Sequence, residues 1–289
     1  MHLNPAGRLL CVAAAVLLAS SAWGQRTVRD DEHPYRGGAP VRSTTADTFE
    51  RFSDARLKPP PIGRGFAAEA STVITPGDAA GAVGPVHLVS STNASFIVYD
   101  RSGSRLLQLT QDQFWIGEEK EDDVFFDPRI AYDERAGRWV AIALHGSISS
   151  EEGGADAVMV AASATSDATG AWSRYRLSNR GLDFTRLALT RDTIMVCSRF
   201  GGGDDFLIFS IDKGALYASP RELPARRYFG APADTVPVDA RDESVEYVVS
   251  TTARSILLNR LDRLDQPWLE FATGETSVST EGPPAPQAG

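Results

Sequence analysis

Cysteine and histidine are scarce in this chain of 289 residues, which holds two cysteines and four histidines. Cys11 lies in an apolar run at the start of the chain, so Cys197 is the only cysteine in the part expected to fold. One cysteine cannot form an intrachain disulfide. The sequence therefore predicts a fold that is stabilised by packing alone.

The motifs of several enzyme classes are also missing. No His-Glu-x-x-His segment or pair of close cysteines offers a zinc site, and no Gly-x-Ser-x-Gly segment offers a serine nucleophile. The glycine run GGGDD at 201–205 lacks the lysine and hydroxyl of a phosphate-binding loop. The net charge of −9 argues against nucleic acid as a partner, because its phosphates would be repelled.

Only one long apolar run occurs, and it lies at the N-terminus. The segment LLCVAAAVLLASSA follows Arg8 and precedes small residues close to Gln25. It is too short to span a bilayer and is typical of a signal peptide, which we expect to cover residues 1–24. No second run of about 18 apolar residues follows. The sequence predicts a secreted or periplasmic protein with no membrane span in its mature part.

The two ends of the mature chain are rich in charge, proline and glycine. Residues 25–71 contain RGGAP and KPPPIGRG, and residues 274–289 end in GPPAPQAG. Such compositions favour turns and linkers over packed elements. We therefore expect a flexible N-terminal arm, a folded region at 72–273 and a linker-like tail.

The folded region contains a degenerate repeat. Apolar residues alternate over short runs between Gly, Asp, Asn and Ser, which is typical of strands and turns. Four segments share an order of aspartate, strand, turn and strand, and each is followed by a second hairpin. They begin at Asp78, Asp127, Asp183 and Asp234, at steps of 49, 56 and 51 residues.

Four strands in a unit of about 50 residues is the content of a β-propeller blade. We predict an all-β propeller of four-stranded antiparallel blades, at about 78–119, 127–178, 183–220 and 234–273. At least four blades are visible. An unclosed propeller would leave bare strand edges. Four blades could close tightly, or the N-terminal arm could complete the ring, but the linker-like tail favours a partial ring from a longer, truncated protein.

Two turns carry signatures of their own. TSDATGAW, at 165–172, is close to the Asp-box pattern S/T-x-D-x-G-x-T-W, with Gly170 one place late and Ala171 in place of Thr. Its aspartate, Asp167, is expected to bond N–H groups of its own turn, and Trp172 is expected to pack between blades. YDERAGRW is a looser turn of this kind and contributes Asp133, Gly137 and Trp139. We interpret all six residues as structural.

The quoted segments together resemble a group of secreted bacterial β-propeller proteins with sialidase-like blades. The resemblance is carried by GDAAGAVGPVHLVSSTNASFIVYDRSG, FDPRIAYDERAGRWV, SATSDATGAWSRY and DFTRLALTRD, and it covers about Gly77 to Phe200. It implies a propeller of six to eight blades. These proteins are largely uncharacterised, so the resemblance implies no shared enzymatic activity.

The sharpest candidates for function are the residues at the blade starts. Rotational repetition would place Asp78, Asp127, Asp183 and Asp234 around the mouth of a central channel, where they could hold Ca²⁺ or a polyol. Arg129 and Arg186 follow closely and could recognise an anion or a sugar carboxylate. The alternative is that each aspartate caps its own turn. No other cofactor is expected, and no residue is assigned a catalytic role.

The segment FDPRIAYDERAGRWV, 126–140, contains both structural residues and candidate functional residues. We expect it to form the inner hairpin of the second blade, with Ile130, Tyr132, Trp139 and Ile142 packed. Only Asp127 and Arg129 keep a functional interpretation.

Three functions are compatible with these features. The favoured one is a non-enzymatic binding or scaffold module for a protein or glycan ligand. A sialidase-like or other glycan-active hydrolase is the second, although no Tyr–Glu nucleophile pair accompanies Arg129, Arg186 and Arg199. The third is an inactive fragment of a longer propeller.

Overall fold

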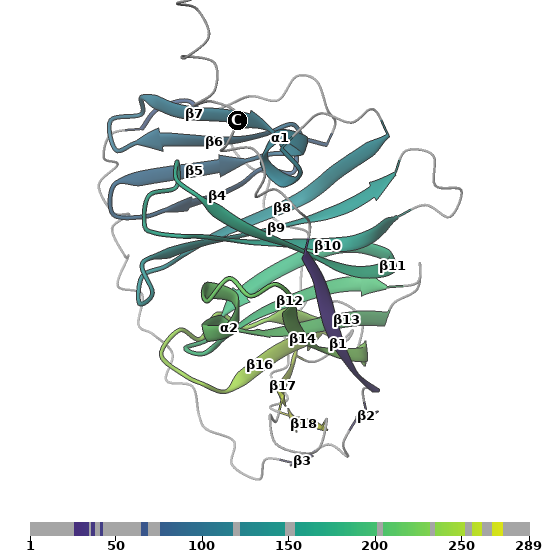
Figure 1. The fold of residues 1–289 in the computed structure, drawn as a ribbon. Helices are drawn as coiled ribbons and strands as arrows, with labels where there is room; N and C mark the ends of the chain where they lie inside the picture. Colours follow the sequence, from purple (N-terminus) through teal and green to yellow (C-terminus); the bar gives the residue numbers. More distant parts are fainter. Residues whose placement is uncertain are drawn as a thin grey trace, which may run out of the picture.

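The computed structural model shows an all-β protein with antiparallel sheets, drawn in Figure 1. It describes residues 26–34, 36–37, 41–42, 65–68, 76–117, 122–147, 154–200, 205–231, 235–251, 256–261 and 268–273. The strands form three sheets, which lie in layers from the top to the bottom of Figure 1. No helix in these ranges has the length and hydropathy that crossing a membrane requires.

The first sheet is a meander of four antiparallel strands. Its order is β4 (Ala80–Val83), β5 (His87–Ser91), β6 (Ser95–Asp100) and β7 (Arg105–Thr110). The turn after β6 forms because the Asp100 carboxylate accepts hydrogen bonds from the N–H groups of Ser102 and Ser104. Helix α1 (Gln111–Trp115) follows β7, and Thr110 and Gln113 cap it reciprocally.

The second sheet has eight strands in the order β1-β14-β13-β12-β11-β10-β9-β8. The bounds are β8 (Asp123–Asp133), β9 (Arg138–Ser147), β10 (Ala155–Ser163), β11 (Trp172–Leu189), β12 (Thr193–Phe200), β13 (Asp205–Asp212), β14 (Leu223–Ala231) and β1 (Arg26–Pro34). The long strand β11 joins two halves of this sheet. Its residues 172–182 pair with β10, and its residues 182–189 pair with β12.

The third sheet contains β15 (Val236–Pro237), β16 (Glu246–Thr251), β17 (Ile256–Leu261) and β18 (Trp268–Thr273), paired in sequence order. Two short strands from the N-terminal arm, β2 (Arg36–Gly37) and β3 (Val41–Arg42), lie parallel to β18.

The described residues of the N-terminal arm between 26 and 42 form strands, although the composition predicted a flexible tether. Strand β1 pairs in parallel with β14 over seven residues, from Val28 opposite Leu223 to Pro34 opposite Phe229. Backbone hydrogen bonding to an open sheet edge needs no hydrophobic pattern, so composition alone did not indicate these strands. The predicted signal peptide and the tail at 274–289 lie outside the described residues.

The predicted third blade, 183–220, stops short of the strand that pairs with β13, which is β14. Residues after β13 form helix α2 (Lys213–Tyr217), whose first turn is capped by the Asp212 carboxylate on the N–H of Ala215. The strand that pairs with β13 is therefore β14, which runs beyond residue 220. The number of blades stays a prediction.

The middle strands are buried on both faces, which explains their apolar sequences. In β9, Val140, Ile142 and Leu144 belong to one hydrophobic cluster, which also takes residues from β12, β13 and α2. The alternate residues Ala141 and Ala143 belong to a second cluster, shared with the first sheet. Because side chains alternate across a strand, one face of β9 is covered by the first sheet and the other by β12, β13 and α2 of the second half of its own sheet.

The second cluster holds the first and second sheets together through aromatic side chains. The rings of Phe96, from β6, and Phe114, from α1, both meet Trp172 edge-on, with centroids 5.6 and 5.2 Å away. Trp139 is fully buried and donates from Nε1 to the carbonyl of Ser166. Ile130, Tyr132 and Ile142 are buried as well, which confirms the packed faces expected for this hairpin.

A third cluster connects the large sheet to the third one. It contains Met195, Cys197, Phe206, Ile208, Tyr228, Val248 and Leu261. Burial raises the pKa of the Cys197 thiol, so this cysteine is a packing residue.

Substituting Gly84 tests the contact between the first two sheets. A Cβ on this residue would lie 2.5 Å from the Trp139 ring, whereas a Cβ on Gly65 would meet nothing within 4 Å. Gly84→Ala should lower the free energy of unfolding by about 1–3 kcal/mol through overpacking. Gly65→Ala is the control and should leave it unchanged. Equal urea midpoints for the two variants would contradict this packing.

Candidate functional site

Two β-bulges each contain a residue with a left-handed backbone, one near the start of β8 and one where β11 leaves β10 and starts to pair with β12; both positions are called strand starts. The pairing of β8 with β9 shifts between Phe126 and Arg129, and that of β11 with β12 shifts between Asp183 and Arg186. Within these bulges Asp127 has a φ of 51° and Phe184 a φ of 53°. Bulges of this kind re-aim side chains and are frequent next to binding sites.

The bulges correct the alignment of the repeats. Asp127 and Phe184 occupy the same position in their bulges, and Arg129 and Arg186 each follow two residues later. Asp183 is therefore the counterpart of Phe126, although the sequence repeat had matched it with Asp127. Asp78, with a φ of 39°, lies just before β4 and has the same backbone conformation.

Asn93 connects two of these strand starts. Its Nδ2 donates to Oδ2 of Asp78 at 2.7 Å, and its Oδ1 accepts from the N–H of Asp127 at 2.9 Å. The side chain is buried and both of its polar atoms are used, so it positions the aspartates. Local sequence patterns do not indicate this role of Asn93, because its partners are 15 and 34 residues away.

The next connection runs from Asp127 to the start of the following inner strand. The hydroxyl of Thr185, which is fully buried, donates to the carbonyl of Asp127 at 2.8 Å. The Ser198 hydroxyl holds the carbonyl of Asp183 at 3.0 Å. Together with the bond from the Asp127 N–H to Asn93, these bonds fix the backbone at Asp127 and Asp183.

The negative charges of Asp78 and Asp183 act on the Asp127 carboxylate. The pKa of Asp127 is raised, first by partial burial and then by the negative charges of Asp78 and Asp183. Arg129 and the N–H of Phe184 act in the opposite direction and only partly compensate. Like charges that are not fully neutralised at one place are typical of functional sites and less so of turn caps.

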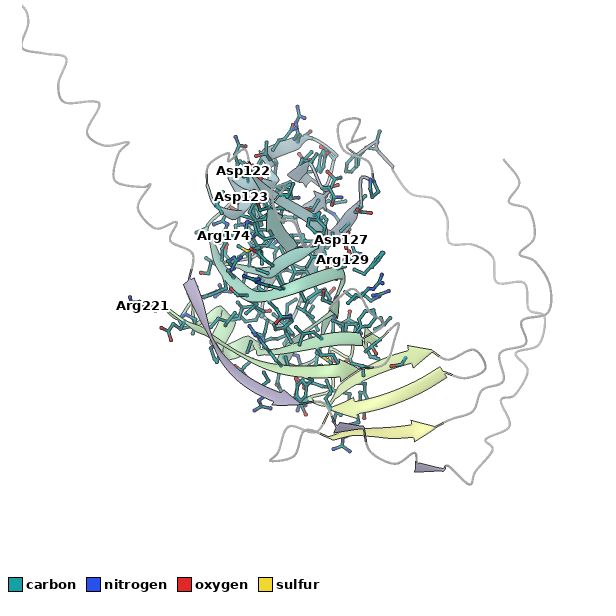
Figure 2. The ribbon with its side chains drawn as sticks, turned by 90° about the vertical axis from the view of Figure 1, so that its right-hand side faces the viewer. Asp122, Asp123, Asp127, Arg129, Arg174 and Arg221 are labelled. Carbon is teal, nitrogen blue, oxygen red and sulfur yellow. The ribbon has the colours of Figure 1, made fainter. Side chains whose placement is uncertain are left out.

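The predicted arginines reach this region but turn to backbone groups. Arg129 donates to the carbonyl of Pro128 at 2.8 Å, and Arg186 donates to the carbonyl of Phe184 at 3.2 Å. The Arg186 guanidinium also lies 5.5 Å from the centroid of Phe206. Figure 2 shows Asp127 and Arg129 close together.

A cavity of about 420 Å³ lies beside β4, β8 and β11, and its described lining includes Arg129 but not Asp78, Asp127 or Asp183. Arg129 belongs to its lining, as do parts of β4 and β8 and Leu187 of β11. The remaining polar lining consists of Glu134, Asp239 and Arg241. A polar, partly open cavity of this size can hold one or two sugar rings or a molecule of similar size.

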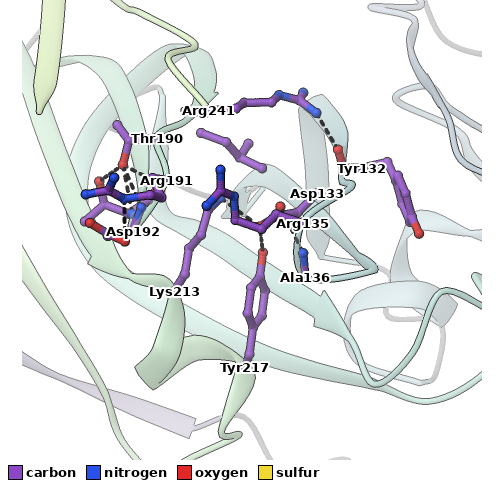
Figure 3. Close-up of polar contacts among 12 residues, drawn as sticks. Tyr132, Asp133, Arg135, Ala136, Thr190, Arg191, Asp192, Lys213, Tyr217 and Arg241 are labelled. Carbon is purple, nitrogen blue, oxygen red and sulfur yellow. Dashed lines mark hydrogen bonds and ion pairs between the residues drawn. The ribbon is translucent and has the colours of Figure 1, made fainter. Parts of the chain in front are cut away.

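Two of the lining residues, Asp239 and Arg241, lie in the segment between β15 and β16 of the third sheet. The Arg241 guanidinium donates to the carbonyl of Tyr132 at 2.7 Å and pairs with the Asp239 carboxylate. Figure 3 shows this contact beside a buried cluster around Asp133.

The buried cluster explains why Asp133 is structural. Its Oδ2 lies 2.7 Å from the Lys213 ammonium and accepts from the Tyr217 hydroxyl at 2.8 Å. Burial alone would raise the pKa of Asp133, but these two partners hold it below its ordinary value. The pKa of Tyr217 is raised, by burial first and by the adjacent carboxylate second. The ion pair thus fastens the first hairpin of the large sheet to α2.

The turn at 165–172 also has structural contacts. The Asp167 carboxylate accepts from the N–H and the hydroxyl of Thr169, at 2.9 and 2.7 Å. Gly170 donates to the carbonyl of Asp167, and Trp172 donates from Nε1 to the carbonyl of Ala168. Gly137, in the looser turn, has a φ of 62°, which favours glycine.

Within the described ranges, no three His, Cys, Asp or Glu side chains are placed to hold a metal ion together. The fourth member of the predicted ring, Asp234, lies outside these ranges. The Ca²⁺ hypothesis therefore gains no support from Asp78, Asp127 and Asp183.

Comparisons with known proteins give only remote likenesses. No family model and no curated protein matches the chain. A solved exo-β-1,3-galactanase from Phanerochaete chrysosporium is 14% identical, with a TM-score of 0.41 over 67% of this chain and 49% of its own. An exo-β-1,3-galactanase from Clostridium thermocellum is 10% identical, with a TM-score of 0.39 over 67% and 47%.

A GH43 β-1,3-galactosidase is 14% identical, with a TM-score of 0.40 over 64% of this chain and 43% of its own. The chain spans about half the length of these structures. Likenesses of this extent place it in no family.

Replacing Asp127 and Asp133 separately should shift stability in opposite directions. A raised pKa means that the folded protein keeps the Asp127 proton at pH values where the unfolded chain has lost it. Stability from this group therefore falls as pH rises from 3.8 through the raised value. Asp127→Asn should raise the Tm at pH 7, and the gain should disappear below pH 3.8.

Asp133→Asn is the matched control with the opposite sign. The lowered pKa of Asp133 contributes stability that is present above 3.8 and is lost as pH falls through the folded-state value. This variant leaves the Lys213 charge buried, so it should cost about 3–5 kcal/mol at pH 7. Thermal unfolding at several pH values measures both. A lower Tm for Asp127→Asn at pH 7 would contradict the electrostatics of the site.

Proposed function

We propose that this chain is an exported β-propeller protein that binds a carbohydrate in the cavity along its inner strands. The observation that carries the proposal is the bonding of Asn93 to both the Asp78 carboxylate and the N–H of Asp127, two residues before Arg129 of the cavity lining. Carboxylates accept strong, charge-assisted hydrogen bonds from sugar hydroxyls, and Arg129 supplies donors from the lining. The backbone of the site is fixed, so little entropy is lost on binding.

The propeller itself is part of this proposal. We propose four blades of four strands, formed by β4–β7, β8–β11, β11–β14 and β15–β18. Three hydrophobic clusters that lie between successive sets of strands support this division. The inner strands β4, β8 and β11 would then surround the cavity, as expected for a central channel.

Binding is best measured by calorimetric titration of the purified protein with neutral oligosaccharides, β-1,3-linked galactooligosaccharides among them. Arg129→Met should weaken binding about 10- to 100-fold, because a charged donor is lost from the cavity. Arg135→Met is the matched control, since Arg135 is exposed and pairs with Asp242 outside the cavity. If the wild type binds no neutral oligosaccharide, or both variants bind equally well, the proposal is wrong.

A second candidate function is hydrolysis of a glycosidic bond. One observation favours it: Asp127 has a raised pKa next to two further carboxylates, which is the pattern of a general acid paired with an ionised partner. In that case the wild type would release reducing ends from a bound oligosaccharide, and Asp127→Asn would bind without release. Binding without release by the wild type would assign the site to recognition alone.

A further inference from the structure

Phe184 is an exposed aromatic residue at the site that the aspartates form. Its exposed fraction is 51%, although large apolar side chains are usually covered. Its φ of 53° lies in the left-handed region, which a bulky residue rarely adopts. Strained residues of this kind persist where the surroundings hold them, and they cluster at ligand sites.

The surroundings of Phe184 hold its backbone rigidly. Its N–H donates to Oδ1 of Asp183 at 3.0 Å and also stabilises the Asp127 carboxylate. Its carbonyl accepts from Arg186, and the next residue, Thr185, is fully buried and bonded to the backbone of Asp127. The aromatic ring is thus carried on a fixed backbone, whose N–H lies at the Asp127 carboxylate.

Phe184 belongs to none of the three hydrophobic clusters of the described residues. The guanidinium of Arg199 lies 6.0 Å from its centroid, and half of the side chain stays open to solvent. Phe184 is also the position at which the third strand start departs from the aspartates of the first two. An exposed ring beside carboxylates combines an apolar surface with hydrogen-bond acceptors, which is the combination that a sugar ring requires on its apolar face and its hydroxyl edge.

We propose that Phe184 is the platform on which the apolar face of a neutral pyranose packs, while the adjacent Asp127 carboxylate accepts from the hydroxyls of that sugar. This inference rests on the proposed function and names the class of sugar. At the Asp127 carboxylate itself the acting charges are two further carboxylates and one guanidinium, whereas Arg186 and Arg199 lie at the Phe184 carbonyl and ring. A sugar acid would be repelled at the Asp127 carboxylate, whereas a neutral sugar would not.

The proposal is tested with Phe184→Ala and Phe184→Trp, titrated with the neutral oligosaccharide that binds best and with a sialylated or uronic acid oligosaccharide. Phe184→Ala should weaken neutral-sugar binding about tenfold, whereas Phe184→Trp should keep it, because an aromatic face is retained. The emission of the introduced tryptophan should shift when the sugar is added. Thermal unfolding should show that both variants fold.

Leu106→Ala is the control, since Leu106 is an exposed apolar residue on β7 and should leave binding unchanged. If Arg129→Met loses binding but Phe184→Ala does not, the carbohydrate site stands and the platform is wrong. If the acidic oligosaccharide binds as tightly as the neutral one, the proposed selectivity is wrong. If the wild type binds no saccharide, both the proposed function and this inference fail.

Discussion

Burial of both faces of the middle strands is the constraint on which the rest of the structure depends. Strands such as β9 and β10 carry apolar residues at consecutive positions, so each face must be covered by other strands. The first sheet covers one face with aromatic rings, and the second half of the large sheet covers the other. Packing of this kind stacks the sheets in one order and brings the inner strands β4, β8 and β11 beside a common cavity.

The geometry of the candidate site is set by the backbone at the strand starts. Two bulges interrupt the ladders there, and side-chain bonds from Asn93 and Thr185 connect one strand start to the next. These bonds join Asp127 to Asp78 and to Thr185, and they supply no positive charge. Asp133 shows the contrast, because its lysine and tyrosine partners stabilise its charge. The Asp133 carboxylate therefore stabilises the fold, whereas the Asp127 carboxylate is repelled by its neighbours. Natural proteins accept such a loss of stability at functional sites.

Local patterns predicted the fold class well. Alternation of apolar residues indicated strands, and turn residues such as Asp100 and Asp167 bond to the N–H groups of their own turns. Features that depend on distant partners were not predicted. Strand β1 joins β14 through backbone bonds that leave no hydrophobic pattern, and α2 displaces the last strand of its unit.

The candidate site was predicted in part. The aspartates and arginines were identified as residues at strand starts, but the repeat was matched by residue type, so Asp183 took the place that belongs to Phe184. A bulge adds one residue without changing the composition, and only the pairing register shows where it lies. Asn93 was missed because its partners are far away in the sequence.

The central claim is that Asp78, Asp127 and Asp183 share one electrostatic site. A carboxyl ¹³C NMR titration of Asp127 tests it most directly, in the wild type and in Asp78→Asn and Asp183→Asn. We expect a pKa above 3.8 in the wild type and a lower value in each variant, because one repelling charge is removed. An ordinary pKa for Asp127, or one that neither variant changes, would contradict the claim.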